Sequence, residues 1–186
     1  MRVSFLWVVL TLWTGHALAV DPRLIEASFP QYVQTEDVLL IKRQSGVLSY
    51  FFVDVYSAAL FTPEGVSSSD LDIAAHPFRL DTYYHRDIDR DDAIDLFWKV
   101  LRRQHSSQEL ERLAPAVNAL HEKIPDIRSG DRYSLTLRAD TAIVLERNGE
   151  HLFSSDDDEF AHAYARLWLG EKGISRKLRR LLLSAE

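Results

Sequence analysis

The chain has 186 residues, no cysteine and a net charge of −6 at pH 7. Its length suits one domain, and 46% of its residues are hydrophobic, which is enough for a core without disulfide bonds. The acidic balance argues against nucleic acid and against an anionic membrane surface as default partners, since both attract basic proteins.

The first 19 residues have the composition of an export leader. Arg2 gives a positive start, Phe5–Trp13 an apolar core, and Ala17-Leu18-Ala19 a small-residue cleavage site. We therefore predict a signal peptide over residues 1–19, cleaved after Ala19, and one exported domain over residues 20–186. The leader holds one basic residue and no acidic one, so cleavage changes the net charge from −6 to −7. The alternative is a retained membrane anchor, although the apolar run is shorter than the roughly 20 residues of a membrane span.

The longest aromatic and β-branched run after the leader, Gly46–Phe61, predicts a long strand. Phe51, Val53 and Val55 would form its apolar face, while the opposite face carries polar tips. Such a strand belongs in a sheet that helices cover on one side only. Before it we expect an extended lead-in, a short strand and a turn, at residues 20–36, 37–42 and 44–46.

The middle of the chain alternates and then becomes helical. Residues 78–85 predict a strand with Tyr84 on its apolar face. Asp89 is predicted to cap a helix whose apolar stripe includes Phe97 and Trp98. A second helix begins at Ser106 or Ser107, and Pro115 within it predicts a kink or a restart.

The last third predicts three more strands and two more helices. Strands over residues 132–138 and 141–147 lead to Asn148-Gly149, the strongest hairpin signal in the chain, and then to a short strand over residues 151–153. One helix begins within residues 156–159 and ends at Gly170, and Ser175 caps a final helix. Strands at both ends, with two helices inserted and two appended, predict an α+β fold with an antiparallel sheet and helices packed on one face.

The sequence contains no complete metal-binding or cofactor-binding motif. The acidic run from Asp87 to Asp92 resembles a calcium loop, but it lacks the glycine and glutamate that such a loop needs, so helix capping explains it better. The chain shows no zinc-ligand spacing, nucleophile elbow or phosphate loop. The residues of a Ser-His-Asp triad can come together in space in any sequence order, so the sequence alone would not reveal one. Nothing in this sequence specifically indicates such a triad. The basic residues 176–180 predict a docked amphipathic helix rather than a membrane-surface helix.

Both ends of the domain resemble the bacterial chalcone isomerase-like family. Gly46, the aromatic run, Val55-Tyr56 and a small-residue segment that ends in Leu60-Phe61 resemble the family's opening hairpin. The closing pattern is similar to an Asn-Gly turn, a helix ending in Trp-Leu-Gly and a short Ser-started helix, here Asn148-Gly149, Trp168-Leu169-Gly170 and Ser175. The match covers about residues 38–183 and implies a chalcone isomerase-like open-faced sandwich. Because the family is mostly bacterial, a cleaved leader implies a periplasmic or secreted protein.

The resemblance also carries expectations about function. Plant chalcone isomerases close a flavanone ring between sheet and helices with Arg, Tyr and Thr, and their fatty-acid-binding relatives use the Arg to hold a carboxylate. Here the Arg position matches Leu48 and the Thr position matches Phe51, and neither side chain can polarise an anionic oxygen. We therefore expect a non-catalytic protein that binds an apolar or fatty-acid-like ligand between sheet and helices. The expected ligand contacts are Leu48, Phe51, Val53, Tyr84 and Trp98.

Two other classes of function stay open. The chain could be an isomerase or lyase with relocated catalytic groups, for which Arg43 and Tyr84 are the candidates. An exposed turn residue is the plainer interpretation of Arg43, since arginine is mostly exposed. The chain could also be a structural partner-binding module, whose signature would be a contiguous exposed apolar patch. The sequence predicts no cofactor, metal or nucleic acid, and it leaves the oligomeric state open.

Overall fold

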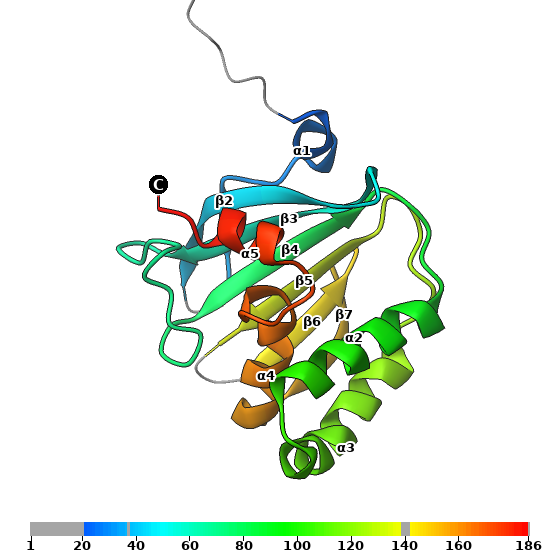
Figure 1. Cartoon of the computed structure of the whole chain (residues 1–186). Helices are drawn as coiled ribbons and strands as arrows, with labels where there is room; N and C mark the ends of the chain where they lie inside the picture. The colour runs from blue at the N-terminus through cyan, green and yellow to red at the C-terminus, as the bar shows by residue number, and fades with distance from the viewer. Residues whose placement is uncertain (1–20, 37, 139–141, 186) are drawn as a thin grey trace, which may run out of the picture.

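In the part of the chain that the structure describes, seven antiparallel strands form one sheet in which every strand pairs with its neighbour in the sequence (Figure 1). The structure, a computed structural model, describes residues 21–36, 38–138 and 142–185. The strands are β1 (Tyr32–Gln34), β2 (Leu39–Tyr50), β3 (Val53–Pro63), β4 (Phe78–Tyr84), β5 (Arg132–Leu137), β6 (Ile143–Arg147) and β7 (Glu150–Ser155). The helices are α1 (Pro22–Ala27), α2 (Arg90–Gln104), α3 (Ser107–Lys123), α4 (Asp158–Leu169) and α5 (Arg176–Leu182). The predicted leader and the turn at Ala139-Asp140 fall outside the described residues.

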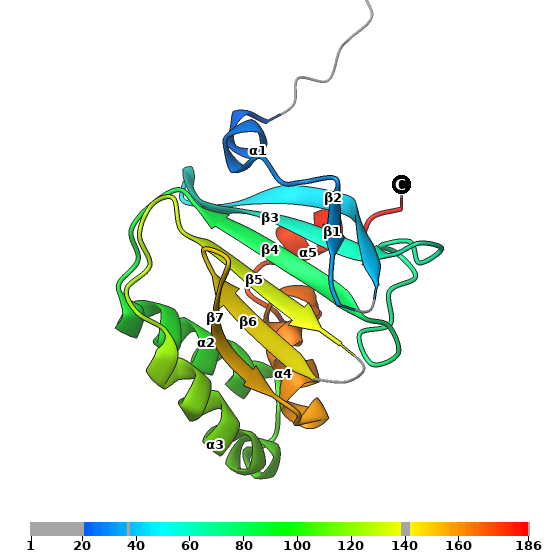
Figure 2. The same ribbon diagram turned by 180° about the vertical axis from the view of Figure 1, so that it is seen from behind.

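Helices α2 to α5 lie on one face of the sheet, and Figure 2 shows the strands in front of α4 and α5. The main hydrophobic core lies between this face and the helices. The predicted α+β fold is therefore confirmed. The other face is not bare, because α1 and the segment after it cover its β2–β3 end with a small second core that contains Phe29, Leu40 and Phe61. No helix in the described part of the chain is long and apolar enough to cross a membrane.

The prediction of one strand from Gly46 to Phe61 is wrong, because the chain reverses within it. Strand β2 ends at Tyr50, strand β3 begins at Val53, and Phe51 and Phe52 form the turn with φ values of 45° and 64°. Left-handed φ at both central residues is the geometry of a two-residue type I′ hairpin. The inward orientation predicted for Phe51 and Val53 is wrong for the same reason, since these residues are 78% and 45% exposed.

The predicted turn at residues 44–46 is also wrong, since these residues lie inside β2. Gly46 is needed for packing rather than for a turn. A Cβ atom at this position would lie 2.9 Å from Leu181 Cδ1 and 3.2 Å from Leu178 Cδ1, so the glycine lets α5 approach the strand closely. Leu178 and Leu182 of α5 are buried, whereas Leu181 is 39% exposed.

Local signals explain most helix ends. Ser106 and Glu109 form a capping box at the start of α3, and this helix continues through Pro115 without the predicted restart. The lead-in predicted as extended contains α1 instead, because the Asp21 side chain accepts a hydrogen bond from the Arg23 amide and Pro22 occupies the first helical position.

Helices α2 and α3 form a hairpin that joins the sheet through two neighbouring segments. One segment follows β4 and the other precedes β5, and Ile88 and Ile127 pair them through two backbone hydrogen bonds of 2.9 and 3.0 Å. This double connector joins the helical hairpin to the sheet next to the candidate site, and α3 packs against α4 and the edge strand β7.

Candidate functional site

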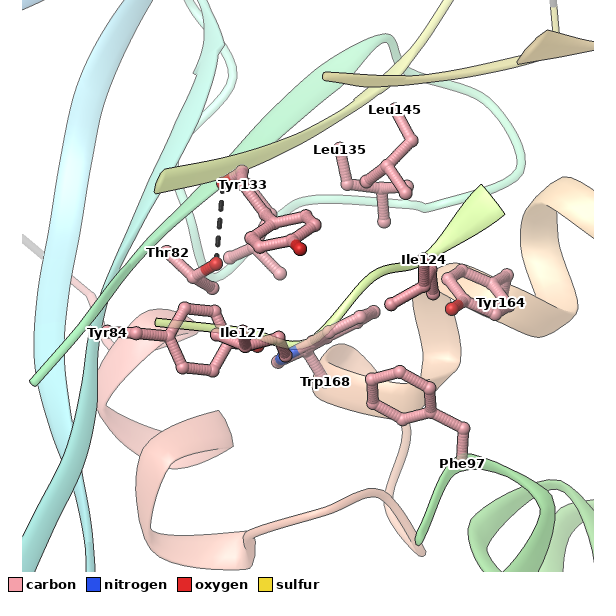
Figure 3. Close-up of a pocket in the computed structure, with 11 residues that line it drawn as sticks. Thr82, Tyr84, Phe97, Ile124, Ile127, Tyr133, Leu135, Leu145, Tyr164 and Trp168 are labelled. Atoms are coloured by element: carbon pink, nitrogen blue, oxygen red, sulfur yellow. Dashed lines mark hydrogen bonds between the residues drawn. The ribbon is translucent and has the colours of Figure 1, made fainter. Parts of the chain in front are cut away.

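A small cavity of about 30 Å³ lies between the sheet and the helices (Figure 3). Strands β4, β5 and β6 form its floor, and α2, α4 and the segment after α3 form its walls. Its lining is almost wholly apolar, and no charged side chain contributes to it. The lining residues are Leu80, Thr82, Tyr84, Phe97, Ile124, Ile127, Tyr133, Leu135, Leu145, Tyr164 and Trp168.

The sequence builds this lining from two periodicities. Alternate residues of β4 and β5 point to the helical face, which brings Thr82 opposite Tyr133 in the sheet register. On α4, Tyr164 and Trp168 are one helical turn apart and therefore share the face that meets the sheet. The result is an aromatic cage in which Phe97, Tyr164 and Trp168 lie with ring centroids 5.8 to 6.0 Å apart.

Within this apolar lining, the Tyr133 hydroxyl has no hydrogen-bond partner although the residue is only 8% exposed. Figure 3 shows this hydroxyl directed into the open middle of the cavity. A buried hydroxyl without a partner costs about 1–3 kcal/mol. The cavity therefore holds an uncompensated polar group that a water or a ligand oxygen would satisfy.

A second unsatisfied pair lies at the Tyr84 end of the cavity. The Trp168 indole N–H and the Tyr56 hydroxyl are both buried without a formed hydrogen bond. The two groups are close to each other. Burial raises the pKa of Tyr56, and the nearby Trp168 indole lowers it by a smaller amount. Tyr84 packs on Tyr56 with ring centroids 5.3 Å apart. The apolar space thus holds two sets of unsatisfied polar groups, the Tyr133 hydroxyl and the Trp168–Tyr56 pair.

The tyrosines of the site are hydrogen-bond donors and not bases. Burial raises the pKa of Tyr133 to about 12. Burial likewise raises the pKa of Tyr84, and the nearby Tyr133 adds to this effect. Burial also raises the pKa of Tyr56 and Tyr164 well above the ordinary value. Neutral phenols can bind an oxygen, but at neutral pH they do not supply a phenolate for proton abstraction.

An ion pair stands beside the Tyr133 end of the cavity. Arg147, the sheet partner of Tyr133, donates to Asp131 at 2.8 Å. Burial alone would raise the pKa of Asp131, but this pKa is lowered because the carboxylate also accepts from the Arg128 amide and the Asn148 side chain. Arg147 is close enough to lower the pKa of Tyr133, against the larger effect of burial, and it is already paired with Asp131.

Among the five predicted ligand contacts, the structure brings only Tyr84 to the cavity. Leu48 packs at the margin of the main core, and Phe51 and Val53 stand at the exposed hairpin turn. Trp98 lies against His121, with ring centroids 5.9 Å apart, and faces a shallow surface hollow on α2 and α3.

The two candidates of the isomerase alternative are far apart. The Arg43 guanidinium donates to the Thr62 hydroxyl at 3.0 Å and to the Pro63 carbonyl at 2.8 Å. Tyr84 pairs in the sheet with Tyr56, six residues before Thr62 on β3, which is about 20 Å along a strand. Arg43 and Tyr84 therefore do not converge on one substrate.

The other face of the sheet holds a Ser-His-Glu arrangement that the sequence did not reveal. Ser57 Oγ lies 2.8 Å from His85 Nε2, and His85 Nδ1 lies 3.4 Å from Glu26 Oε2. Ser57 is fully buried beneath α1, and its hydroxyl also donates to the Arg23 carbonyl at 3.2 Å. The amides around Ser57 pair with β2 and β4, so none is free to form an oxyanion hole. This chain of contacts holds α1 on the sheet. No sequence signal could have found it, because the three residues come from distant segments.

Comparison with known proteins identifies the family of this chain. The family model described as "Chalcone isomerase-like" matches residues 23–184. The chain belongs to the chalcone isomerase-like family. The crystal structure of a fatty-acid binding protein of Arabidopsis thaliana is similar to this chain with a TM-score of 0.62. The two chains are 14% identical, and the similarity covers 83% of this chain and 90% of the plant protein.

At that identity the likeness to the plant protein shows a shared fold and not a shared ligand. No curated protein matches the chain. Within the residues that the structure describes, no group of three or more His, Asp or Glu side chains could hold a metal ion.

Proposed function

We propose that this member of the chalcone isomerase-like family is a non-catalytic protein that binds an apolar or fatty-acid-like ligand between sheet and helices. The observation that supports this function is the unsatisfied Tyr133 hydroxyl inside an otherwise apolar cavity. Few polar groups within an apolar lining are typical of small-molecule sites. The family and its fatty-acid-binding structural relative point to the same class of ligand.

The size of the cavity adds a requirement to this proposal. A cavity of about 30 Å³ holds one or two waters, whereas ligand pockets commonly occupy roughly 300–1,000 Å³. Ligand uptake therefore needs α2 and α3 to move away from the sheet. The Ile88–Ile127 connector is the natural hinge, because it is the place where this helical hairpin joins the strands.

The chemistry of the lining also specifies the ligand. The cavity offers no charged side chain, so a carboxylate would need Arg147 to exchange its partner Asp131 for the ligand. A long apolar molecule with an uncharged or protonated oxygen fits the lining better. We place the ligand oxygen at Tyr133 and its tail between the sheet and α4.

The isomerase alternative has no comparable support. The positions that match the family's Arg and Thr hold Leu48 and Phe51, and Arg43 lies away from the cavity. We also propose that the protein works after export, in the periplasm or outside the cell, because the composition of Met1–Ala19 is that of a cleavable leader.

Native mass spectrometry of the protein purified without detergent tests the proposed binding. We expect an adduct that organic extraction identifies as a fatty acid or a related lipid. If the protein emerges free of ligand, titration with long-chain fatty acids and fatty alcohols should restore the adduct.

Tyr133→Phe should weaken ligand retention at least several-fold, and Tyr83→Phe, which changes a tyrosine on the other face of the sheet, is the matched control. A protein that retains no lipid and takes up neither acid nor alcohol would refute the proposed function. So would equal retention by both variants.

A further inference from the structure

Four consecutive apolar residues form the tip of the β2–β3 hairpin and project into solvent. We call Tyr50, Phe51, Phe52 and Val53 the aromatic turn, and their exposed fractions are 68%, 78%, 104% and 45%. Single exposed apolar residues are common, but a contiguous exposed group usually marks a contact with something apolar. Hairpin turns ordinarily use glycine, asparagine and aspartate at this position.

The same sheet contains a second two-residue turn, which shows which residues are sufficient to reverse the chain. Asn148-Gly149 joins β6 to β7 with φ values of 54° and 82°, the same left-handed pair that Phe51 and Phe52 adopt at 45° and 64°. Glycine and asparagine tolerate this conformation, whereas bulky side chains rarely adopt it. The two phenylalanines are therefore not needed to turn the chain, and the backbone holds them in an unfavourable conformation. Strain of this kind is typical of functional segments.

The base of the hairpin is braced, so the aromatic turn is presented on a fixed support. Ser49 donates to Asp54 at 2.8 Å, and Arg23 of α1 donates to the same carboxylate at 3.2 Å. Figures 1 and 2 both show α1 beside this turn. The Tyr50 and Phe51 rings pack edge to face with centroids 4.5 Å apart.

The size of this surface decides between a protein and a lipid as its partner. A stable protein interface buries about 800 Å² and roughly 20–30 residues on each side. Four residues at a hairpin tip cannot supply this, whereas insertion into a lipid interface needs apolar and aromatic side chains and no matching surface. The charges at the base carry no positive excess, because one arginine, Arg23, pairs with two carboxylates, Glu26 and Asp54. Binding should therefore not depend on anionic lipid.

We propose that the aromatic turn inserts into the lipid–water interface of a bilayer and attaches the protein reversibly to membranes. This inference stands without the proposed ligand, since exposed residues outside the cavity carry it. If both hold, the attached protein would exchange its apolar ligand at the membrane.

Flotation of the purified full chain with phosphatidylcholine vesicles tests the attachment. The variant Phe51→Asn/Phe52→Gly replaces the aromatic pair with the residues of the second turn, so the hairpin should still form while its apolar tip is lost. We expect the unmodified protein to float with the vesicles and this variant to bind at least tenfold more weakly. Intact mass should first show that both carry the same N-terminus, so that any leader contributes equally. Leu96→Ser, which removes another exposed apolar side chain on α2, is the matched control and should bind like the unmodified protein.

Two results would overturn the proposal. One is the absence of flotation with phosphatidylcholine vesicles. The other is binding that needs phosphatidylglycerol, persists in Phe51→Asn/Phe52→Gly and disappears in Arg176→Glu/Arg180→Glu, which would assign attachment to the basic helix α5. Failure of ligand binding with intact flotation would refute the proposed function alone.

Discussion

At the residue scale, the Tyr133 hydroxyl lies in the cavity without a hydrogen-bond partner. Removal of a buried unsatisfied hydroxyl abolishes its desolvation cost, so Tyr133→Phe should leave the free energy of unfolding of the empty protein unchanged or raise it by up to about 1 kcal/mol. Urea denaturation of ligand-free protein measures this effect. A loss of more than about 1 kcal/mol would mean that an ordered water already satisfies the hydroxyl.

The backbone of the aromatic turn predicts that the variant expected to lose membrane binding should gain stability. A left-handed conformation costs a non-glycine residue about 1–2 kcal/mol, and Phe51 and Phe52 both adopt it. Phe51→Asn/Phe52→Gly should therefore raise the free energy of unfolding by roughly 1–3 kcal/mol. Thermal or chemical denaturation measures the gain. Unchanged or reduced stability would show that the phenylalanines contribute contacts that offset the strain.

The close packing of α5 on Gly46 can be tested by adding one methyl group at this position. A Cβ atom there would press on the flexible ends of Leu178 and Leu181, but it would also lie 3.2 Å from Leu181 Cβ, which moves only with the backbone of α5, so the helix would have to shift. Gly46→Ala should lower the free energy of unfolding by about 1–3 kcal/mol, the usual cost of overpacking. Gly65→Ala does not serve as its control, because Gly65 has a φ of 84°. Ser45→Ala, at the neighbouring residue of β2, is the better control. An equal loss of stability in Gly46→Ala and Ser45→Ala would contradict the close approach of α5.

At the element scale, one imidazole lies at the junction of α2, α3 and α4. His121 is 3% exposed, neither ring nitrogen has a partner, and the rings of Phe97, Trp98 and Tyr164 lie 5.8 to 6.0 Å away. Burial, reinforced by the Arg90 guanidinium, lowers its pKa from 6.5 to about 4.

Protonation of His121 should loosen this junction as the pH falls. Between about pH 6.5 and pH 4 the unfolded chain binds a proton that the folded chain does not, so stability decreases with falling pH by up to about 1.4 kcal/mol per unit. His121→Leu should remove about 2 kcal/mol of the stability difference between pH 7 and pH 5. His151→Leu changes an exposed histidine and is the control. An equal pH dependence of His121→Leu and the unmodified protein would contradict this role.

The elements show where the sequence was informative. Residues 78–85 alternate cleanly, so β4 and its buried face with Tyr84 followed from periodicity, and Asn148-Gly149 fixed its hairpin because these residues favour left-handed φ. The position of the β2–β3 turn could not be predicted, because Phe51-Phe52 carries no turn signal and β propensity continues through it. The cavity was equally hidden, since Tyr133 and Trp168 meet only through the sheet order and the placement of α4.

At the scale of the whole molecule, the cavity lies between two parts that are joined in different ways. Helix α4 follows β7 directly, and its Phe160, Tyr164 and Leu167 side chains are buried in the main core. The α2–α3 hairpin is inserted between β4 and β5, and its chain connections to the sheet are the paired segments at Ile88 and Ile127. Its other contacts are side-chain packing against α4 and, from α3, against β7. An inserted unit with a narrow connection is the part that can open without unfolding the sheet.

Native-state hydrogen exchange should therefore find two levels of protection. Amides of α2 and α3 should exchange through an opening that costs less free energy than global unfolding, while β3 to β5 and α4 should exchange only through global unfolding. A bound apolar ligand holds the helical hairpin closed over the cavity and should raise the protection of α2 and α3 selectively. Leu113→Ala weakens packing inside this unit, so it should lower the protection of α2 and α3 much more than that of β4. Exchange of all helices and strands at one common free energy would mean that the hairpin cannot open by itself. A ligand larger than one or two waters would then have no route into the cavity, and the proposed site between sheet and helices would have to be abandoned.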